Sequence, residues 1–174
     1  WYRAEVNRAQ MNLLDSHDVP RALHTLKGDV AALKLSLLLL FLQPGAPCIY
    51  YGTEVGLAGG PDDDRSSGPE PACREAFPWE QPWTADLCGY VSRLKALRDR
   101  WINLGQPLIT WNPVGSEGLT ASTDTWRLWI NRSRKTDLRC STPDTANDVI
   151  CGGFVDGTLR PQSAVICFPP GAKG

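Results

Sequence analysis

Two short strand-like stretches on either side of one helical segment constrain the fold of this chain more than any other feature. Residues 12–18 begin with an apolar run and end in polar side chains. Residues 44–54 pass from turn residues into a strand-like CIYY and then reach a glycine and an acid. Between them, residues 30–42 are almost all helix formers rich in leucine and alanine. The order strand, helix, strand predicts the βαβ crossover of a parallel sheet.

The polar end of the first stretch is a candidate functional site. Buried parallel strands have apolar bodies, and polar side chains at their C-terminal ends line the mouths of active sites. His17 and Asp18 occupy that position, whereas Asp15 is expected to support the end of the strand. Judged from the residues alone, Asp18 is equally suited to capping a helix that begins near Pro20. The residues themselves therefore leave both a functional and a structural role open for Asp18.

Charge and hydrophobicity exclude several classes of partner. The net charge of the 174 residues is −1, and no basic or acidic block suggests a nucleic acid or an anionic membrane as partner. The apolar run at residues 33–42 is far shorter than the roughly 18 residues of a membrane span, so a buried helix is expected. The six cysteines match no zinc-binding spacing. Free thiols are expected, with a Cys140–Cys151 bridge as the alternative.

The later part of the chain changes from helical to strand-like patterning. Residues 85–101 carry an apolar stripe at three- and four-residue steps, which predicts an amphipathic helix with Arg98 on its other faces. Gly105 and Pro107 end this helix. Four strands are then predicted, at residues 108–112, 118–122, 125–133 and 163–169. The polar stretch at 133–160 has no pattern that assigns it.

The two strand-like stretches, in this order, resemble the seventh and eighth strand motifs of the α-amylase family of glycoside hydrolases. GTEVGLAGGPDDD and the later CREAFPWE are similar to the cyclomaltodextrinase and neopullulanase group of that family. The resemblance implies an α/β fold: residues 1–105 form the last two βα units of a (β/α)8 TIM barrel, and residues 106–174 form a small antiparallel β-sandwich. A complete barrel takes about 250 residues, so the chain is expected to be a C-terminal fragment of a larger enzyme.

The resemblance also implies roles for the polar residues that follow the strands. In the family, the aspartate of this His-Asp pair is the third carboxylate of the site. Asp18 is therefore expected to stabilise an oxocarbenium-like transition state, and His17 to donate a hydrogen bond to the same sugar. Glu54, after the second stretch, is expected to give structural support first and to act in the site second.

The long loop after the second stretch resembles one that binds substrate beside the cleavage point. Asp62 and Arg74 match the aspartate and arginine of that loop, although an apparent insertion leaves Arg65 as a rival for the arginine role. The acidic run that starts at Asp62 lacks the further oxygen ligands of a calcium-binding loop, so no metal site is expected. Trp79 and Trp83 are suited either to stacking on sugar rings or to packing under the loop.

The function implied by the resemblance is retaining hydrolysis, with transglycosylation as a further activity, of α-glucosidic bonds in maltooligosaccharides, cyclodextrins or pullulan. The family's nucleophilic aspartate and acid/base glutamate lie on the fourth and fifth strands, which this sequence lacks, so the 174 residues alone are expected to be inactive. No cofactor is expected, and the parent enzyme is expected to be a cytoplasmic homodimer. A non-catalytic carbohydrate-binding or scaffold member of the same fold is the alternative.

Overall fold

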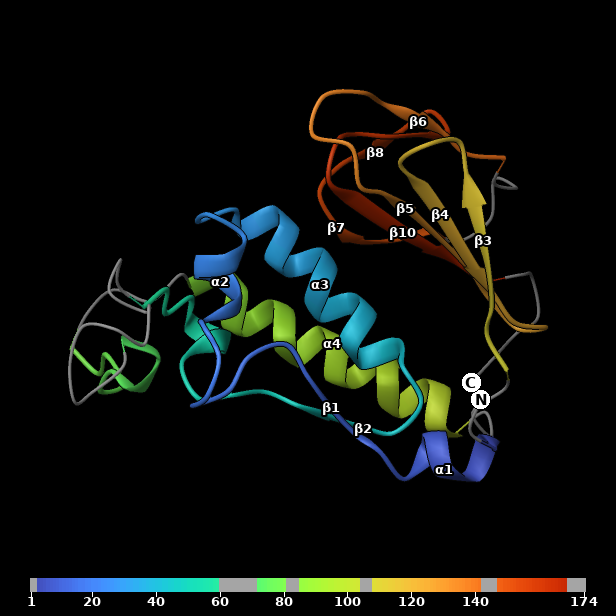
Figure 1. Ribbon diagram of the computed structural model, residues 1–174. Helices are drawn as coiled ribbons and strands as arrows, with labels where there is room; N and C mark the ends of the chain where they lie inside the picture. Colours follow the sequence, from blue (N-terminus) through green and yellow to red (C-terminus); the bar gives the residue numbers. More distant parts are fainter. Residues whose placement is uncertain (1–2, 60–71, 81–84, 104–107, 142–146, 169–174) are drawn as a thin grey trace. The chain divides into compact units, whose positions relative to one another are not determined.

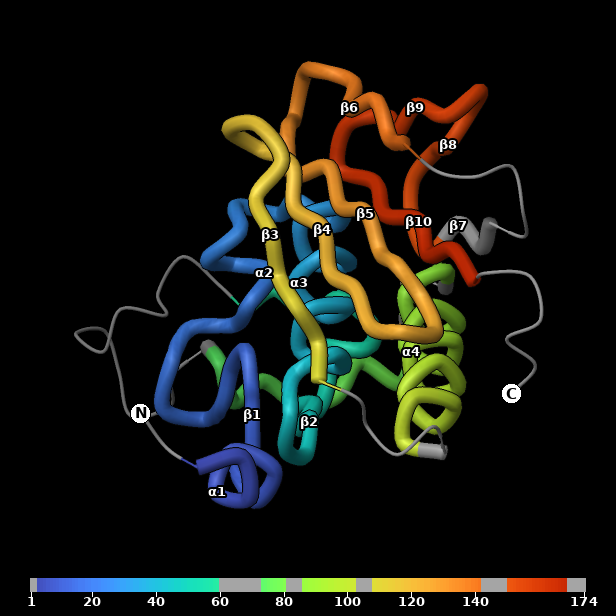
Figure 2. Tube along the Cα trace, turned by 90° about the vertical axis from the view of Figure 1, so that its right-hand side faces the viewer, coloured from blue at the N-terminus to red at the C-terminus, as the bar shows by residue number. Residues whose placement is uncertain are grey.

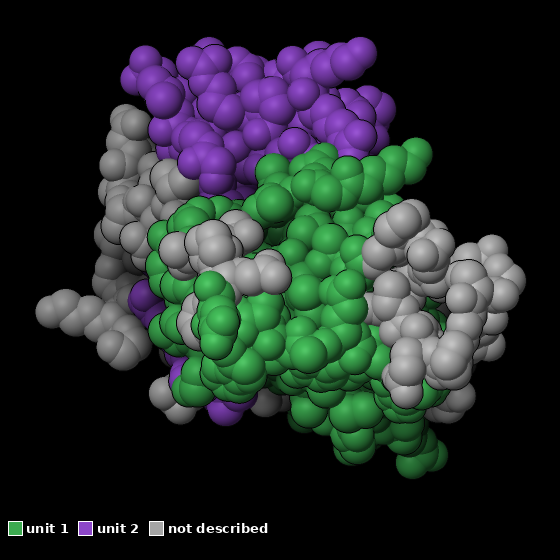
Figure 3. Space-filling view, turned by 90° about the vertical axis from the view of Figure 1, so that its left-hand side faces the viewer, with its two compact units in different colours: residues 1–98 green, residues 99–174 purple. Residues whose placement is uncertain are grey.

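The computed structural model describes residues 3–59, 72–80, 85–103, 108–141 and 147–168 of the chain. The chain divides into two compact units, Trp1–Arg98 and Asp99–Gly174, which Figure 3 shows in different colours. The first unit combines helices with a two-stranded parallel sheet, and the second contains antiparallel sheets. The elements up to the boundary are α1 (Ala4–Arg8), β1 (Met11–Leu13), α2 (Ala22–Thr25), α3 (Val30–Leu42), β2 (Ala46–Cys48), the 3-10 helices η1 (Thr53–Val55) and η2 (Ala72–Arg74), and α4 (Ala85–Asn103), which crosses it.

The first unit is built on the predicted βαβ crossover. β1 and β2 pair in parallel, with Met11 opposite Ala46 and Leu13 opposite Cys48, and α3 connects them (Figure 1). Both strands end earlier than the sequence predicts, at Leu13 and Cys48. The polar residues at 15–18 and the tyrosines at 50–51 therefore lie in the turns after the strands, outside the pairing of β1 with β2.

The helix α3 is buried and has clear limits at both ends. Asp29 caps its N-terminus by accepting a hydrogen bond from the backbone nitrogen of Ala32 at 3.0 Å. Gln43 leaves the helix in an extended conformation, as expected for the residue that precedes a proline. Seven of its side chains are buried, namely Leu33, Leu35, Leu37, Leu38, Leu40, Phe41 and Leu42. Among the described residues, no helix is both long and apolar enough to span a membrane.

The helix α4 runs alongside α3 and has the apolar stripe that the sequence predicts (Figure 1). The prediction for Arg98 was wrong, because this residue is only 8% exposed. It lies four residues after the buried Leu94, on the stripe itself. Its guanidinium donates to the carbonyls of Phe41 at 2.6 Å and Gln43 at 3.0 Å, and also to that of Gly45. Phe41 and Gln43 lie at the C-terminus of α3, where carbonyls have no partners within the helix, and Gly45 lies in the corner that follows.

The second unit contains one five-stranded and one three-stranded antiparallel sheet. The larger sheet has the order β3-β4-β5-β10-β7, which can be followed in Figure 2, and the smaller has the order β6-β9-β8. The four predicted strands are all present, and β4 has the predicted bounds. The stretch that the sequence could not assign supplies four more. The strands are β3 (Thr110–Val114), β4 (Gly118–Ser122), β5 (Arg127–Asn131), β6 (Leu138–Arg139), β7 (Asn147–Cys151), β8 (Phe154–Val155), β9 (Thr158–Leu159) and β10 (Ser163–Cys167).

The central strand β5 is buried on both faces. Leu128 and Ile130 are fully buried on one face, and Trp129 is 7% exposed on the other. Asn131 is also buried, and its amide nitrogen donates to three backbone carbonyls at 2.8 to 3.2 Å. Because side chains on both faces of β5 are buried, alternation of residues along this strand cannot separate a core face from a solvent-exposed face.

All six cysteines are free thiols, as the sequence predicts, and Cys140 and Cys151 form no bridge. Burial raises the pKa of the Cys140 thiol to about 11 and also raises the pKa of Cys167. Both side chains belong to an apolar cluster of the second unit that also contains Trp129, Leu159 and Val165. They act there as small apolar core residues.

Substitution of Gly45 tests the backbone conformation of the corner between α3 and β2. The φ of Gly45 is +94°, and a Cβ atom at this position would lie 2.3 Å from the backbone oxygen of Gln10. Substitution of Gly45 by alanine is expected to lower the free energy of unfolding by more than about 2 kcal/mol, because both the backbone conformation and the contact become unfavourable. Urea unfolding followed by circular dichroism measures this change.

Gly89 provides the matched control for that substitution. It lies within α4, and a Cβ atom there would meet nothing within 4 Å beyond its chain neighbours and the adjacent backbone of the helix itself. Gly89→Ala should therefore raise the free energy of unfolding by about 0.5–1 kcal/mol, through helix propensity alone. Equal effects of the two substitutions would contradict the described conformation of the corner.

Candidate functional site

The candidate site is a cluster of three exposed polar side chains in the first unit: His17 and Asp18, which follow β1, and Arg74, at the end of η2. The imidazole Nε2 of His17 lies 3.2 Å from one carboxylate oxygen of Asp18. A guanidinium nitrogen of Arg74 lies 3.6 Å from the other carboxylate oxygen. The side chains of His17 and Asp18 are 61% and 60% exposed. The carboxylate thus lies between two nitrogen groups and remains open to solvent.

Residues 72–75 are held against the backbone at this position. Arg74 donates from Nε to the carbonyl oxygen of His17 at 3.2 Å, and the thiol of Cys73 lies 3.4 Å from the same oxygen. The hydroxyl of Tyr51 donates to the carbonyl of Glu75 at 2.7 Å. The segment is therefore attached both to the turn after β1 and to the turn after β2, which places Arg74 beside Asp18.

The buried carboxylate of Asp15 holds the turn that presents the cluster. Asp15 is 3% exposed and accepts a hydrogen bond from the backbone nitrogen of Ala22 at 2.9 Å. The hydroxyl of Thr53 donates to both of its oxygens, at 3.0 and 2.8 Å. Asp15 thus caps the start of α2 from seven residues upstream and connects it to η1. This confirms the supporting role predicted for Asp15.

The carboxylate of Asp15 meets the start of α2, where the sequence leaves a capping role open for Asp18. The residue at the N-cap of α2 is Arg21, and no side chain of that residue caps the helix. The carboxylate at the start of α2 belongs to Asp15, and the carboxylate of Asp18 is directed to His17 and Arg74. An exposed ion pair contributes at most about 1 kcal/mol to stability. The cluster is therefore not what holds this region together.

Arg21 is a residue of this region whose burial sequence reasoning missed. It is fully buried, and its guanidinium donates to the carbonyl of Tyr51. Its central carbon lies 4.4 Å from the ring centre of Tyr50 and 4.7 Å from that of Tyr51. Arginines are mostly exposed, so the only available signal was the pair of adjacent tyrosines after the second strand. Burial, with a hydrogen bond to Tyr51, raises the pKa of Tyr50 to about 12.

The remaining predicted residues are distributed as follows. Asp62, its rival neighbour Arg65 and Trp83 lie outside the described residues. Glu54 lies in η1, where one of its carboxylate oxygens is buried without a hydrogen-bond partner among the described residues. Trp79 is exposed, which excludes the prediction that it packs under the loop. In the part of the chain that the structure describes, no three side chains of metal-binding type come together.

The cluster is chemically suited to binding a neutral polyhydroxylated ligand. A carboxylate can accept two or more hydrogen bonds from vicinal hydroxyl groups, and the guanidinium and imidazole can donate to others. The same carboxylate would also stabilise positive charge that develops close to it. Because all three side chains are accessible, a ligand can reach them without a large rearrangement.

Comparison with known proteins gives a consistent result. Residues 2–112 match the profile described as the alpha amylase catalytic domain. A cyclomaltodextrinase of Geobacillus thermopakistaniensis (strain MAS1) is 35% identical over 141 residues, which cover 77% of this chain and 23% of that protein. An intracellular maltogenic amylase of Bacillus subtilis (strain 168) is 40% identical over 95 residues, which cover 54% of this chain and 15% of that protein.

The structural comparison extends the similarity along most of the chain. The crystal structure of a debranching enzyme from Nostoc punctiforme superposes with a TM-score of 0.72 at 27% identity. The superposition covers 95% of this chain and 34% of that protein. The chain therefore spans about a third or less of the length of each of these three proteins.

Two aspartates that are three positions apart should respond very differently to substitution. Asp15→Ala leaves the Thr53 hydroxyl and the Ala22 amide without their buried acceptor. It is expected to lower the free energy of unfolding by about 2–4 kcal/mol. Asp18→Ala removes an exposed carboxylate and should change that free energy by no more than about 0.5 kcal/mol. Chemical denaturation of both variants measures the difference, and a comparable loss in the two would contradict the assigned roles.

Proposed function

Because the chain belongs to the alpha-amylase family, we propose that it forms part of a glycoside hydrolase that cleaves α-linked glucans. The single observation that carries the proposal is the exposed carboxylate of Asp18 between His17 and Arg74. An arrangement that contributes little to stability and presents three polar groups to solvent is better explained by ligand binding. Maltooligosaccharides, cyclodextrins and pullulan are the proposed substrates.

The parallel strands β1 and β2, with α3 between them and α4 after them, are proposed to be the last two βα units of a (β/α)8 barrel. The barrel part would comprise residues 1–105, and residues 106–174 would be a separate β-sandwich domain. The parallel pairing of β1 with β2 and the two antiparallel sheets of the second unit support this division. In such barrels, active sites lie at the C-terminal ends of the strands, which is where His17 and Asp18 follow β1.

In the proposed reaction, Asp18 binds hydroxyl groups of the sugar and stabilises the positive charge that develops at the anomeric carbon. His17 donates a hydrogen bond to the same sugar, and this bond strengthens as the ring becomes oxocarbenium-like. Asp18 is not the attacking group in this scheme. A retaining mechanism needs a nucleophile and an acid/base whose carboxyl groups are about 5 Å apart, and we propose that residues outside this sequence supply both.

Arg74 is proposed to bind substrate beside the bond that is cleaved, together with Asp62. Its ion pair with Asp18 and its hydrogen bond to the His17 carbonyl support Arg74 for this role. The complete enzyme is proposed to be a homodimer in the cytoplasm. The Bacillus subtilis relative, which is named an intracellular enzyme, supports the proposed location.

The 174 residues by themselves are expected to show no turnover of cyclodextrin, pullulan or starch. Asp15 is already engaged by Thr53 and Ala22, so it cannot serve Asp18 as a second reacting carboxylate. Release of reducing sugar by the purified chain is the measurement. Turnover above the buffer rate would show that the chain contains its own nucleophile and acid/base.

In the complete enzyme, Asp18→Asn is expected to lower kcat by about 100-fold or more, because the amide cannot stabilise the developing charge as a carboxylate does. Asp124→Asn is a suitable control, since Asp124 is an exposed aspartate of the second unit. Steady-state hydrolysis of a cyclodextrin measures both variants. Full activity of Asp18→Asn would instead favour a non-catalytic role for the cluster.

A further inference from the structure

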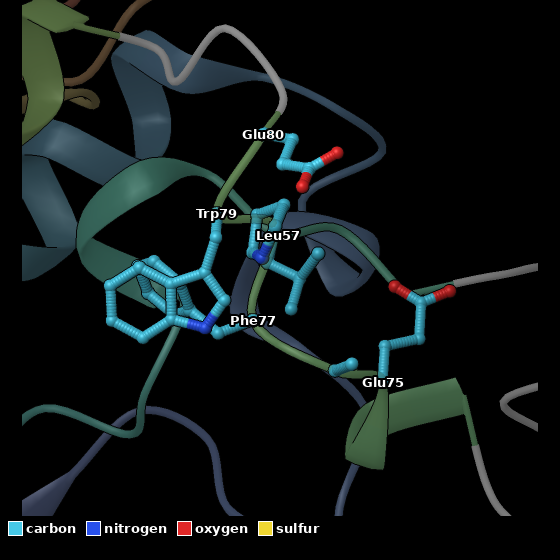
Figure 4. Close-up of a pocket in the computed structure, with 7 residues that line it drawn as sticks. Leu57, Glu75, Phe77, Trp79 and Glu80 are labelled. Atoms are coloured by element: carbon cyan, nitrogen blue, oxygen red, sulfur yellow. The ribbon is translucent and has the colours of Figure 1, made fainter.

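A second feature of the first unit is a pocket lined by an aromatic pair and two acids. It is open to solvent, has a volume of about 590 Å³ and is lined by Leu57, Glu75, Phe77, Trp79 and Glu80, with Ala76 and Pro78 between them. Figure 4 shows the rings of Trp79 and Phe77 together on one side, Leu57 in the middle, and the carboxylates of Glu75 and Glu80 on other sides. Volumes of this order are typical of small-molecule sites.

Trp79 is unusually exposed for so large an apolar side chain. It is 77% exposed, and the centre of its indole lies 4.5 Å from that of the Phe77 ring, at an angle of 49°. Phe77 thus supports the indole on one side, while most of its surface meets water. Leaving such an area in water has a free-energy cost that ligand binding would remove.

The pocket is continuous along the chain with the cluster of His17, Asp18 and Arg74. Glu75 lines the pocket and directly follows Arg74, which contacts Asp18. The hydrogen bond from the Tyr51 hydroxyl to the Glu75 carbonyl fixes the start of this segment. A ligand bound to the cluster could therefore extend along the same segment towards Trp79.

We propose that Trp79, supported by Phe77, is a stacking platform for a glucose ring of an α-glucan, at a subsite additional to the cluster. The apolar C–H face of a sugar ring matches the open face of an indole, and its equatorial hydroxyls can donate to the carboxylates of Glu75 and Glu80. The described lining residues include two acids, Glu75 and Glu80, whose negative charge disfavours phosphate and other anions. The identity of the sugar as an α-glucan rests on the proposed function.

The platform can be tested on the chain itself by fluorine NMR after incorporation of 5-fluorotryptophan. Loss of one resonance in Trp79→Phe identifies the signal of Trp79. Addition of maltose is expected to shift this signal saturably, and cellobiose, with its β-linkage, should shift it less. A Trp79 signal that does not move, or that moves without saturation, overturns the proposal.

Affinity is measured separately, from saturation transfer to the maltose protons. Trp79→Ala should weaken binding by about tenfold or more, whereas Trp79→Phe, which keeps an aromatic face, should retain most of it. Leu108→Ala is the matched control, because Leu108 is an 80% exposed apolar side chain outside the pocket. Unchanged affinity in Trp79→Ala would contradict the platform, and melting curves check that each variant is folded.

The Asp18→Asn variant separates this proposal from the proposed function. Maltose should still shift the Trp79 signal in that variant, since the platform does not use the Asp18 carboxylate. If Asp18→Asn keeps full turnover in the complete enzyme while Trp79 still binds maltose, the proposed catalytic role is wrong and the platform stands. If turnover depends on Asp18 while Trp79 does not respond to maltose, the platform alone is wrong.

Discussion

The buried carboxylate of Asp15 is the interaction on which the rest of the first unit depends. It joins three segments that are distant in sequence, because it follows β1, caps α2 and receives the hydroxyl of Thr53 from η1. A buried carboxylate without partners would be strongly unfavourable, so all three segments must be in place together. Arg21 adds a second connection, between α2 and the tyrosines after β2. The exposed cluster is supported by this buried pair of polar residues.

Asp15 and Asp18 are the same residue type in different environments, and their roles differ accordingly. The first is buried and already accepts hydrogen bonds from Ala22 and Thr53, so its burial keeps a ligand from reaching it. The second is largely exposed and contacts exposed side chains, so a ligand could reach its carboxylate. Asp15 therefore stabilises the turn, and Asp18 is the aspartate proposed to bind the ligand, so loss of Asp15 should also disturb the cluster whereas loss of Asp18 should leave the turn in place.

The sequence predicted the elements whose patterns are local. The helix α3, the parallel pairing around it, the stripe of α4 and the strand β4 all follow from periodicity and turn residues. It did not predict Arg98 or Arg21 as buried, because their partners are backbone carbonyls and aromatic rings of distant segments. The short strands from β6 to β9 also escaped prediction, since segments of two to five residues leave too little pattern to read. For the site, the sequence named His17, Asp18 and Arg74 as candidates. The contact between Arg74 and Asp18 is seen only in the structure.

The hydrogen bonds of Arg98 have a consequence for synthesis of the chain on the ribosome. The carbonyl of Gly45 and the guanidinium that binds it are 53 positions apart. During synthesis, the carbonyls of this corner can bind only water at first. Their hydrogen bonds to Arg98 can form only after most of α4 has been translated and has left the exit tunnel. Nascent chains paused before that point would expose the leucines of α3, and such intermediates are the species that chaperones bind.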